Sequence, residues 1–456
     1  MSIIINEPVP NLKPESRTSK HKNMRTRTIK GFSKLSKEEK MQWVAEHFFE
    51  DMATVVEDWR GFWHRDKDLQ NTLDGFSENT LSNFPIPFGV APNFIINGRA
   101  YAIPMAIEES SVVAAASYAA KIWMARGGFH AEVVNTIKIG QVHFLWKGEP
   151  SHLKAQFEKL KAKLRAEAKG ITERMDQRGG GILDIELINM SDQEPRYHQL
   201  KVSFETCDSM GANFINSVLE QFAATLKNEF PAQVEIIMSI LSNYTPDCSV
   251  KAWAECPIAD LEGICKEHSA VTFANKFYRA VRIAEIDPYR ATTHNKGIYN
   301  GIDAVVLATG NDFRAIEACG HTYAARNGQY SSLSHCSLEN GMFRFELEVP
   351  MAVGTVGGLT KLHPLAKRSL QMLGQPSAKE LMKIIAVVGL AQNFAAVRSL
   401  ITTGIQQGHM KMHLQNILQH FNAHNGEVEA TIKYFEDKKV SFNGVRLFLE
   451  ELRQEK

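Results

Sequence analysis

The sequence lacks the features that mark secreted, membrane-spanning and zinc-binding proteins. Its six cysteines are scattered over 456 residues and none forms a Cys-x-x-Cys pair, so we expect reduced thiols and no metal site. No apolar run approaches the roughly 20 residues that a membrane helix needs, and the N-terminus has no signal-peptide pattern. A net charge of +1 argues against nucleic-acid or membrane binding by the chain as a whole. We therefore expect a cytoplasmic protein.

Two simple catalytic signatures are also missing or weak. There is no G-x-G-x-x-G motif, so a Rossmann nucleotide-binding unit is not indicated. His335 and Cys336 are neighbours that offer a base and a nucleophile, but adjacent residues seldom face each other productively. A catalytic cysteine is therefore only a minor alternative.

The composition is that of a globular protein with two or three domains, since 44% of the residues are hydrophobic and 23% are charged. Residues 1–30 are polar and broken by prolines, and Lys/Arg exceed Glu over residues 13–40. We interpret this stretch as a flexible basic tail, with a phosphate-binding arm as the less favoured alternative. Ser36 and Glu39 fit the capping box of a helix that we expect to run to about Arg60.

Residues 76–94 read FSENTLSNFPIPFGVAPNF. Prolines and glycine among aromatic residues predict a long, fixed loop, a type that often lines a site. A hairpin is predicted around Asn97-Gly98. A small-residue helix then begins at Ser110 or Ser111, with Glu109 at its N-terminus, where the helix dipole favours a carboxylate.

Residues 136–243 predict a separate small domain. Their expected order is strand, charged helix, strand, strand, helix and strand, as in a split β-α-β sandwich. The second helix follows the turn Asp208-Ser209-Met210-Gly211-Ala212-Asn213. A turn of small residues at a helix N-terminus offers free backbone N–H groups to a phosphate.

The stretch from Arg290 to Arg314 reads RATTHNKGIYNGIDAVVLATGNDFR. Its apolar run IDAVVLATG has the length of a buried strand. Asp312 follows this run, and an ionised carboxylate beside a buried segment needs a partner, for which Lys296 is the nearest cation. An ordinary surface position for Asp312 remains equally open.

The last third of the chain carries three further features. Gly354–Gly358, GTVGG, predicts a flexible turn or one that approaches a phosphate. Gln392 and Asn393 lie inside an apolar helix, where buried amides need partners. His409 follows Gly404 and Gly408 at a predicted hinge, although a lone histidine is more often structural.

Seven of these stretches together resemble hydroxymethylglutaryl-CoA reductase of the bacterial, soluble type (class II). The resemblance covers about residues 27 to 435. The motifs, in the family's order, are ENTLSNFPIPFGVAPNF, EESSVVAAAS, DSMGAN, DPYRATTHNKGIYNGIDAVVLATGND, VGGLTKLHPLA, GLAQNFAAVRSL and QGHMKMHLQNI. The chain departs from the family in having Ser110 where a proline is common and Ser209 where an alanine is common, and its N-terminal tail is longer than expected.

The resemblance implies the reduction of hydroxymethylglutaryl-CoA to mevalonate and CoA with two hydrides from NADH or NADPH. It implies four catalytic residues: Glu109, Lys296, Asp312 and His409. An ammonium at Lys296 suits the developing oxyanion, and a histidine at His409 suits protonation of the CoA thiolate. Glu109 would need a raised pKa to donate a proton to the alkoxide, with Asp312 and Lys296 as tuning groups.

The resemblance also implies binding residues. The substrate residues are Arg290, Ser111, Asn300, Gln392 and Asn393, among which Arg290 can clamp a free carboxylate. The cofactor residues on the small domain are Asp208, Met210, Gly211, Ala212, Asn213 and Asn243. No metal is implied, and the choice between NADH and NADPH stays open.

The fold implied is α+β: a large helical and sheet substrate domain with an inserted ferredoxin-like cofactor domain and a helical C-terminal segment. Its expected parts are residues 1–135, 136–243, 244–404 and a mobile segment 405–456. The resemblance further implies a homodimer, or a higher oligomer of dimers, that shares its site between subunits. A reductase for another acyl-CoA and a catalytically silent CoA-binding relative are the alternatives.

Overall fold

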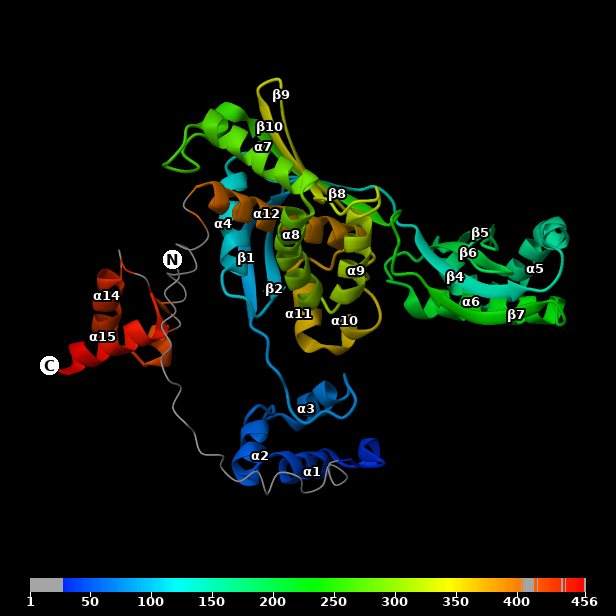
Figure 1. The fold of residues 1–456 in the computed structure, drawn as a ribbon, viewed down its shortest axis with the longest axis horizontal. Helices are drawn as coiled ribbons and strands as arrows, with labels where there is room; N and C mark the ends of the chain where they lie inside the picture. The colour runs from blue at the N-terminus through cyan, green and yellow to red at the C-terminus, as the bar shows by residue number, and fades with distance from the viewer. Residues whose placement is uncertain are drawn as a thin grey trace, which may run out of the picture. The chain divides into compact units, whose positions relative to one another are not determined.

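The structure is a computed structural model that describes residues 28–402, 404, 414–415, 417–435, 438 and 440–454. The chain divides after Pro85 into two compact units (Figure 1). The described part mixes helices with three antiparallel sheets, which confirms the predicted class.

The first unit is helical. It contains a short 3₁₀ turn and three helices: η2 (Phe32–Lys34), α1 (Lys37–Phe48), α2 (Met52–Gly61) and α3 (Lys67–Asp74). The capping box of Ser36 and Glu39 is present. The prediction of one helix to Arg60 is wrong, because the chain leaves the helix at Phe49 and Asp51 caps a new one.

The second unit begins with a hairpin. Strands β1 (Phe88–Ile96) and β2 (Arg99–Ala106) pair around Asn97 and Gly98, both at positive φ, as predicted. The expected loop over residues 76–94 is therefore wrong from Phe88 onward. A register shift between Ala91 and Phe94 accommodates Pro92, which has no N–H for the ladder. Helix α4 (Val112–Met124) packs on β1.

A four-stranded sheet in the order β3-β8-β10-β9 forms the other wall of this core. Its strands are β3 (His130–Val133), β8 (Ser249–Pro257), β9 (Ser334–Glu339) and β10 (Met342–Pro350). The turn η3 (Ile258–Leu261) follows β8, and α7 (Ala270–Ile286) packs on β9. The Phe394 ring meets Trp123 edge to face and Phe277 at a tilt, and Phe277 meets Phe343 and Phe345 of β10 edge to face, so helices and strands share one apolar core.

Helix α8 (Pro288–Ala308) runs through this core and packs on α12 (Ala378–Ile401). The predicted strand IDAVVLATG is wrong: Ile302–Ala308 continue α8, and Thr309 and Gly310 end it. The run is apolar all round because this half of α8 is buried on most sides, and periodicity cannot separate such a helix from a buried strand. Helices α9 (Phe313–Ala324), α10 (Leu359–Leu362) and α11 (Pro364–Met372) complete the group.

Helix α12 is a longer apolar stretch than we expected, since the sequence was judged to contain no apolar run near the length of a membrane helix. Its 24 residues pass a length and composition test for a membrane span, with a mean hydropathy of 1.7, but 72% of its most apolar window is buried inside the protein. A helix that is hydrophobic all round and buried is what the centre of a large core requires.

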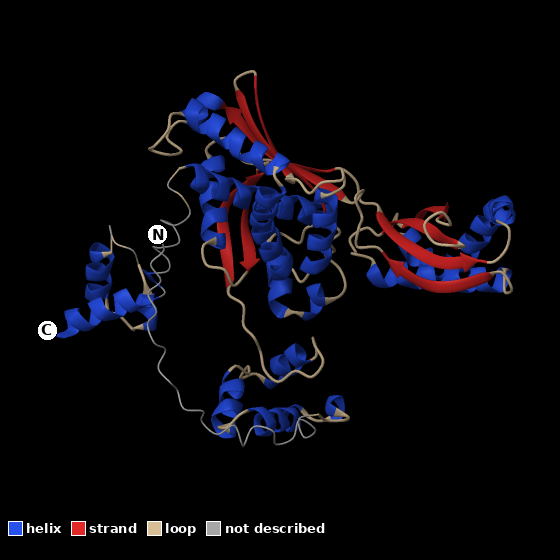
Figure 2. Cartoon of the chain, in the orientation of Figure 1, coloured by secondary structure: helices blue, strands red, loops and turns tan. Residues whose placement is uncertain are grey.

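Residues 138–241 form a second layered structure with its own core. Strands β4 (Lys138–Trp146), β5 (Gly181–Asn189), β6 (Tyr197–Glu205) and β7 (Val234–Leu241) make an antiparallel sheet in the order β5-β6-β4-β7. Helices α5 (Pro150–Asp176) and α6 (Ala212–Glu229) lie against this sheet (Figure 2). This is the split β-α-β order, and the domain limits of 136 and 243 remain a prediction.

The C-terminal segment contains α14 (Asn425–Tyr434) and α15 (Phe442–Gln454). Glu427 is buried between them, with its oxygens 2.7 and 2.9 Å from the Arg453 guanidinium. This pairing lowers the pKa of Glu427 to about 2, so the carboxylate stays ionised.

The contact between α8 and α12 yields a stability prediction. A Cβ at Gly301 would lie 2.7 Å from the Val388 carbonyl oxygen and 2.8 Å from the Gln392 Cβ. Since neither a backbone nor a Cβ can move aside cheaply, Gly301→Ala should lower the free energy of unfolding by about 1–3 kcal/mol. Denaturant titration measures this change.

Gly297→Ala is the matched control on the same helix. A Cβ at Gly297 meets nothing within 4 Å, and alanine favours a helix by about 0.5–1 kcal/mol over glycine. This variant should be neutral or more stable. Equal losses in both variants would contradict the close approach of α8 and α12.

Candidate active site

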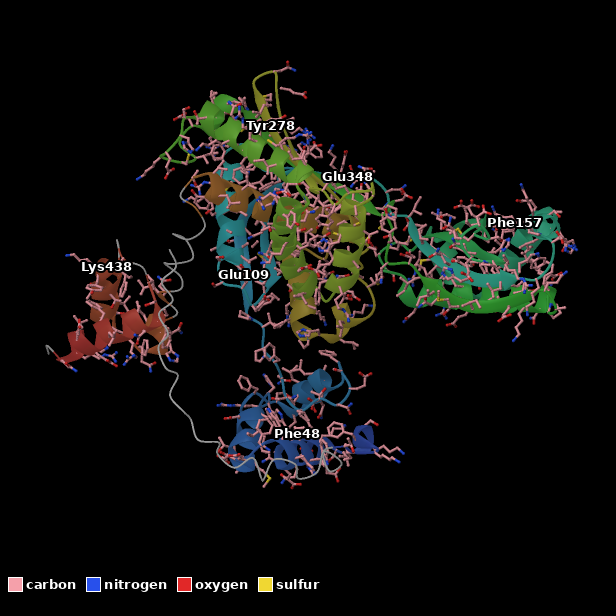
Figure 3. The ribbon with its side chains drawn as sticks, in the orientation of Figure 1. Phe48, Glu109, Phe157, Tyr278, Glu348 and Lys438 are labelled. Atoms are coloured by element: carbon pink, nitrogen blue, oxygen red, sulfur yellow. The ribbon has the colours of Figure 1, made fainter. Side chains whose placement is uncertain are left out.

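A lysine–glutamate pair is the centre of the candidate site. Lys296 on α8 places its Nζ 2.7 Å from Oε2 of Glu109. Glu109, which Figure 3 labels, precedes α4. The two side chains are 61% and 36% exposed, so a ligand can reach both. The structure thus brings together two of the four residues expected to be catalytic.

The backbone before α4 is held in an unusual conformation. Ser111 is the N-cap residue but has a φ of 83° and makes no capping hydrogen bond with its side chain. A positive φ is uncommon for a residue with a side chain and marks a constrained position. The predicted side-chain cap is therefore wrong, and the Ser111 hydroxyl has no partner among the described residues.

Two amides near Lys296 also lack partners. Asn300 lies one turn along α8, and its side chain makes no hydrogen bond within the described part of the chain. Gln392 on α12 is 5% exposed, and its Oε1 has no hydrogen-bond donor. Because an unpaired buried amide costs free energy, Gln392 suits a polar ligand. Asn300 is only partly buried, so a ligand can reach it.

Asn393 is used differently from the sequence expectation, which placed it beside the substrate. Its Oδ1 accepts a hydrogen bond from Oγ of Ser334 at 2.9 Å, and its Nδ2 donates to the His294 carbonyl. The Ser334 Oγ is also 2.6 Å from Nε2 of His294. Since the single hydroxyl proton goes to Asn393, Nε2–H of His294 must be the donor. This buried chain fixes α8 two residues before Lys296.

His294 is uncharged at neutral pH. Burial, followed by the nearby Arg290 charge, lowers the pKa of His294 to about 3. A neutral ring is required here, because a buried charge without a counter-ion is costly. His294 therefore acts as a packing and hydrogen-bonding group for α8.

Arg290 lies in the first turn of α8 and is half-buried. No carboxylate within the described ranges forms an ion pair with it, and burial lowers the pKa of its guanidinium. A desolvated guanidinium without a partner is prepared for a carboxylate from a ligand, which it can hold with two hydrogen bonds.

Asp312 is not paired with Lys296, contrary to the sequence expectation. It caps α9, accepting hydrogen bonds from the backbone N–H groups of Arg314 and Ala315, and the Arg314 guanidinium lies 3.2 Å from both carboxylate oxygens. The expectation failed because the residues before Asp312 end a helix and those after it begin another. His409 lies outside the described residues.

The predicted cofactor turn lies at the start of α6, an 18-residue helix. Gly211 has a φ of 92° there, and a Cβ would come within 2.5 Å of the Thr206 side chain, so glycine is required for the turn. Lys138, which is 4% exposed, donates to Thr206 at 2.6 Å. Met210 and Asn243 line one small cavity with Lys138.

Asp208 joins this turn to the larger core. Its carbonyl accepts a hydrogen bond from Thr355 N–H at 2.9 Å, and its carboxylate accepts one from Ala378 N–H at 2.7 Å. A cleft of about 460 Å³ lies here, between Asp208 and the GTVGG turn, and also contains Lys361 and Lys367. Neither lysine was expected from the sequence, although Lys361 lies only three residues after the Gly-rich turn. Two cations and a Gly-rich turn suit a phosphate group.

Two other chemistries find no support in the described residues. Cys336 is 1% exposed, and burial raises the pKa of its thiol, while His335 pairs with Glu285 at 2.6 Å. The minor alternative of a catalytic cysteine is therefore wrong, since the thiolate is the nucleophile. No group of three or more His, Cys, Asp or Glu side chains within the described residues is placed to hold a metal ion.

Comparison with known proteins gives one consistent result. The family model described as hydroxymethylglutaryl-coenzyme A reductase matches residues 36–414. The chain is 37% identical over 427 residues to 3-hydroxy-3-methylglutaryl-coenzyme A reductase of Archaeoglobus fulgidus, covering 93% of this chain and 94% of that protein. It is 32% identical over 395 residues to the probable enzyme of Borreliella burgdorferi, covering 87% and 89%.

A solved structure also matches. It is the class II 3-hydroxy-3-methylglutaryl-CoA reductase of Streptococcus pneumoniae bound to NADPH in open conformations, with a TM-score of 0.68 and 37% identity over 88% of this chain and 99% of that chain. The family resemblance predicted from the motifs is confirmed.

The buried chain of His294, Ser334 and Asn393 yields a prediction. Ser334→Ala leaves an N–H of His294 and Oδ1 of Asn393 unpaired in the core. Each unpaired group costs about 1–3 kcal/mol, so the free energy of unfolding should fall by about 2–6 kcal/mol. Ser337→Ala on the same strand is the control, because the Ser337 hydroxyl has no described partner. A similar loss in both variants would contradict the assigned network.

Proposed function

We propose that this chain, which belongs to the hydroxymethylglutaryl-coenzyme A reductase family, reduces the thioester of (S)-3-hydroxy-3-methylglutaryl-CoA to mevalonate and CoA, or runs the reverse oxidation. The observation that carries the proposal is the accessible Lys296–Glu109 pair at 2.7 Å. It stands beside polar groups that have no partners of their own, as a site for a polar substrate requires.

Lys296 would stabilise the negative charge that each reduction step places on oxygen. A hydride that adds to the thioester carbonyl, and later to the aldehyde, leaves an oxyanion, and an ammonium fixed nearby lowers the energy of that transition state. The short contact with Glu109 allows a proton to pass between the two side chains. Glu109 is thus the proposed proton donor to the alkoxide.

The substrate portion would be held by groups around this pair. Arg290 suits the free carboxylate of the hydroxymethylglutaryl portion, because it is half-buried and forms no described ion pair. Ser111, Asn300 and Gln392 suit its hydroxyl and carbonyl oxygens. Asn393 would act indirectly, through its hydrogen bonds to Ser334 and His294.

NADH or NADPH would supply the two hydrides when bound, as the NADPH-bound relative suggests. The turn at Asp208, Met210, Gly211, Ala212 and Asn213, together with Asn243, would hold it. Support comes from the free N–H groups at the α6 N-terminus and from the cleft that Asp208 shares with Lys361 and Lys367.

Other parts of the proposal rest on the family resemblance. His409 would protonate the departing CoA thiolate, and Asp312 would tune the proton donor. Residues 136–243 would be the cofactor domain between two parts of the substrate domain, 1–135 and 244–404, with a mobile segment 405–456. We further propose a cytoplasmic homodimer, or an assembly of dimers, that shares its site between subunits.

An assay of NADH and NADPH oxidation, run separately with hydroxymethylglutaryl-CoA and with simple acyl-CoAs, tests the function. We expect oxidation that depends on hydroxymethylglutaryl-CoA. A preference for simple acyl-CoAs would point to a reductase of another thioester, and the absence of any signal would favour a silent CoA-binding relative.

Lys296→Ala should reduce turnover by about a thousandfold or more, because the oxyanion loses its main stabilising charge. The fold should survive, since Lys296 is mostly exposed, and circular dichroism would check this. Lys121→Ala on α4, a solvent-exposed lysine, is the control and should retain turnover. Activity of Lys296→Ala near the wild-type level would refute the assigned role.

His409→Gln should slow reduction of the thioester more than reduction of added mevaldehyde. Only the first reaction releases a thiolate that needs a proton. Steady-state rates with the two substrates measure the difference. Equal losses on both would contradict the role of His409.

A further inference from the structure

A buried lysine contacts the turn that we propose to hold the nicotinamide cofactor. Lys138 begins β4, an interior strand of the sheet that packs against α6 (Figure 1). It is 4% exposed, and the apolar side chains of Ile215, Leu241 and Ile316 line the same cavity. Because a lysine is rarely buried to this extent unless it is paired, its presence here needs a physical reason.

No negative charge compensates the Lys138 ammonium within the described residues. No carboxylate in those ranges forms an ion pair with it. Glu205 lies close in the chain to the turn, but it accepts hydrogen bonds from the Thr136 hydroxyl and from the N–H of Cys207. A buried charge without a counter-ion costs free energy, so stability alone does not favour lysine over an apolar side chain of similar length.

The ammonium is bound to the turn itself. Its Nζ donates to Oγ1 of Thr206, which is fully buried, at 2.6 Å and lies 3.4 Å from the Ser209 carbonyl oxygen. The Thr206 hydroxyl donates to the same carbonyl at 2.6 Å, and Ser209 N–H donates to the Thr206 carbonyl at 3.0 Å. Lys138 and Thr206 thus fix the Ser209 carbonyl, two residues before Gly211.

The Gly-rich turn after β10 contacts the same residues. A Cβ at Gly354 would lie 2.5 Å from the backbone nitrogen of Met210 and 3.1 Å from the carbonyl carbon of Ser209. Thr355 N–H donates to the Asp208 carbonyl at 2.9 Å. Two separate elements, β4 and the Gly-rich turn, therefore fix the backbone that leads into α6.

We propose that Lys138 is a positioning residue for the cofactor: through Thr206 and the Ser209 carbonyl, it fixes the turn so that the N–H groups at the start of α6 are in place for the dinucleotide. This inference rests on the proposed function. A turn that is already ordered avoids the entropy cost of ordering when the ligand binds. The uncompensated ammonium also adds positive potential near a site for an anion, which explains why the position holds a lysine.

Lys138→Met is the first test, since methionine has a similar length but neither the charge nor the donor. NADH and NADPH are titrated separately into the full chain without hydroxymethylglutaryl-CoA. The Kd of the dinucleotide that the wild type binds should rise about tenfold, as the loss of one charge-assisted hydrogen bond implies. The KM for hydroxymethylglutaryl-CoA should stay near the wild-type value. Lys201→Met, which removes the same charge from a partly exposed position on β6, is the matched control and should bind the dinucleotide as the wild type does.

Thr206→Val tests the link between the lysine and the turn, because valine keeps the shape of threonine and removes the hydroxyl. It should also weaken dinucleotide binding, whereas Thr206→Ser, which keeps the hydroxyl, should bind as the wild type does. The double variant Lys138→Met with Thr206→Val should bind no more weakly than Lys138→Met alone, because both changes break one link. Losses that multiply would overturn the action through Thr206. The two Thr206 variants decide the question even where Lys138→Met does not fold.

The outcomes separate the claims. A lower melting temperature of Lys138→Met with an unchanged Kd would overturn the positioning role. Equal rises in the dinucleotide Kd and in the KM for hydroxymethylglutaryl-CoA would overturn it too, because they would indicate a general loosening of the fold. Wild-type protein that binds a dinucleotide but does not reduce hydroxymethylglutaryl-CoA would overturn the proposed reaction, while the Kd comparison would still decide the role of Lys138. Wild-type protein that binds neither dinucleotide would overturn both.

Discussion

The close crossing of α8 and α12 is the constraint on which the candidate site depends. Gly301 brings α8 against the backbone of Val388, and Gly389 brings α12 against Ile302. With no side chains to separate the helices at these points, Gln392 is carried next to the segment of α8 that holds Asn300. The apolar character of both helices serves this contact, since a helix buried on all sides can be fixed in position only by its packing.

Hydrogen bonding then separates the groups that build the scaffold from those left for a ligand. Asn393 is bound to Ser334 and His294, whereas the neighbouring Gln392 has a buried oxygen with no donor. Arg290 shows the same contrast among charged groups, because burial removes its water and no described carboxylate replaces it. Unsatisfied groups reduce stability, so the unpaired Arg290 and Gln392 indicate that this part of α8 and α12 is shaped for binding rather than for folding.

Sequence could predict much of this arrangement where a local rule decides the outcome. The capping box at Ser36, the hairpin at Asn97-Gly98 and the order of helices and strands along residues 138–241 follow from short-range signals, and the motifs identified the family. The apolar run after Ile302 was misassigned because burial on all sides removes periodicity. Asp312 was misplaced for the same reason, because it was expected to follow a buried strand and instead follows α8 and caps α9.

The position of Asp208 shows why the regions proposed to bind cofactor and substrate cannot be adjusted independently. Its carbonyl binds the Gly-rich turn through Thr355, and its carboxylate binds the first N–H of α12 at Ala378. The same helix carries Gln392 about four turns later, roughly 21 Å along its axis. A rigid helix transmits a displacement of its first turn over that length. A change in the turn that we propose to hold the nicotinamide cofactor must therefore either break the Asp208–Ala378 hydrogen bond or move the helix that carries Gln392.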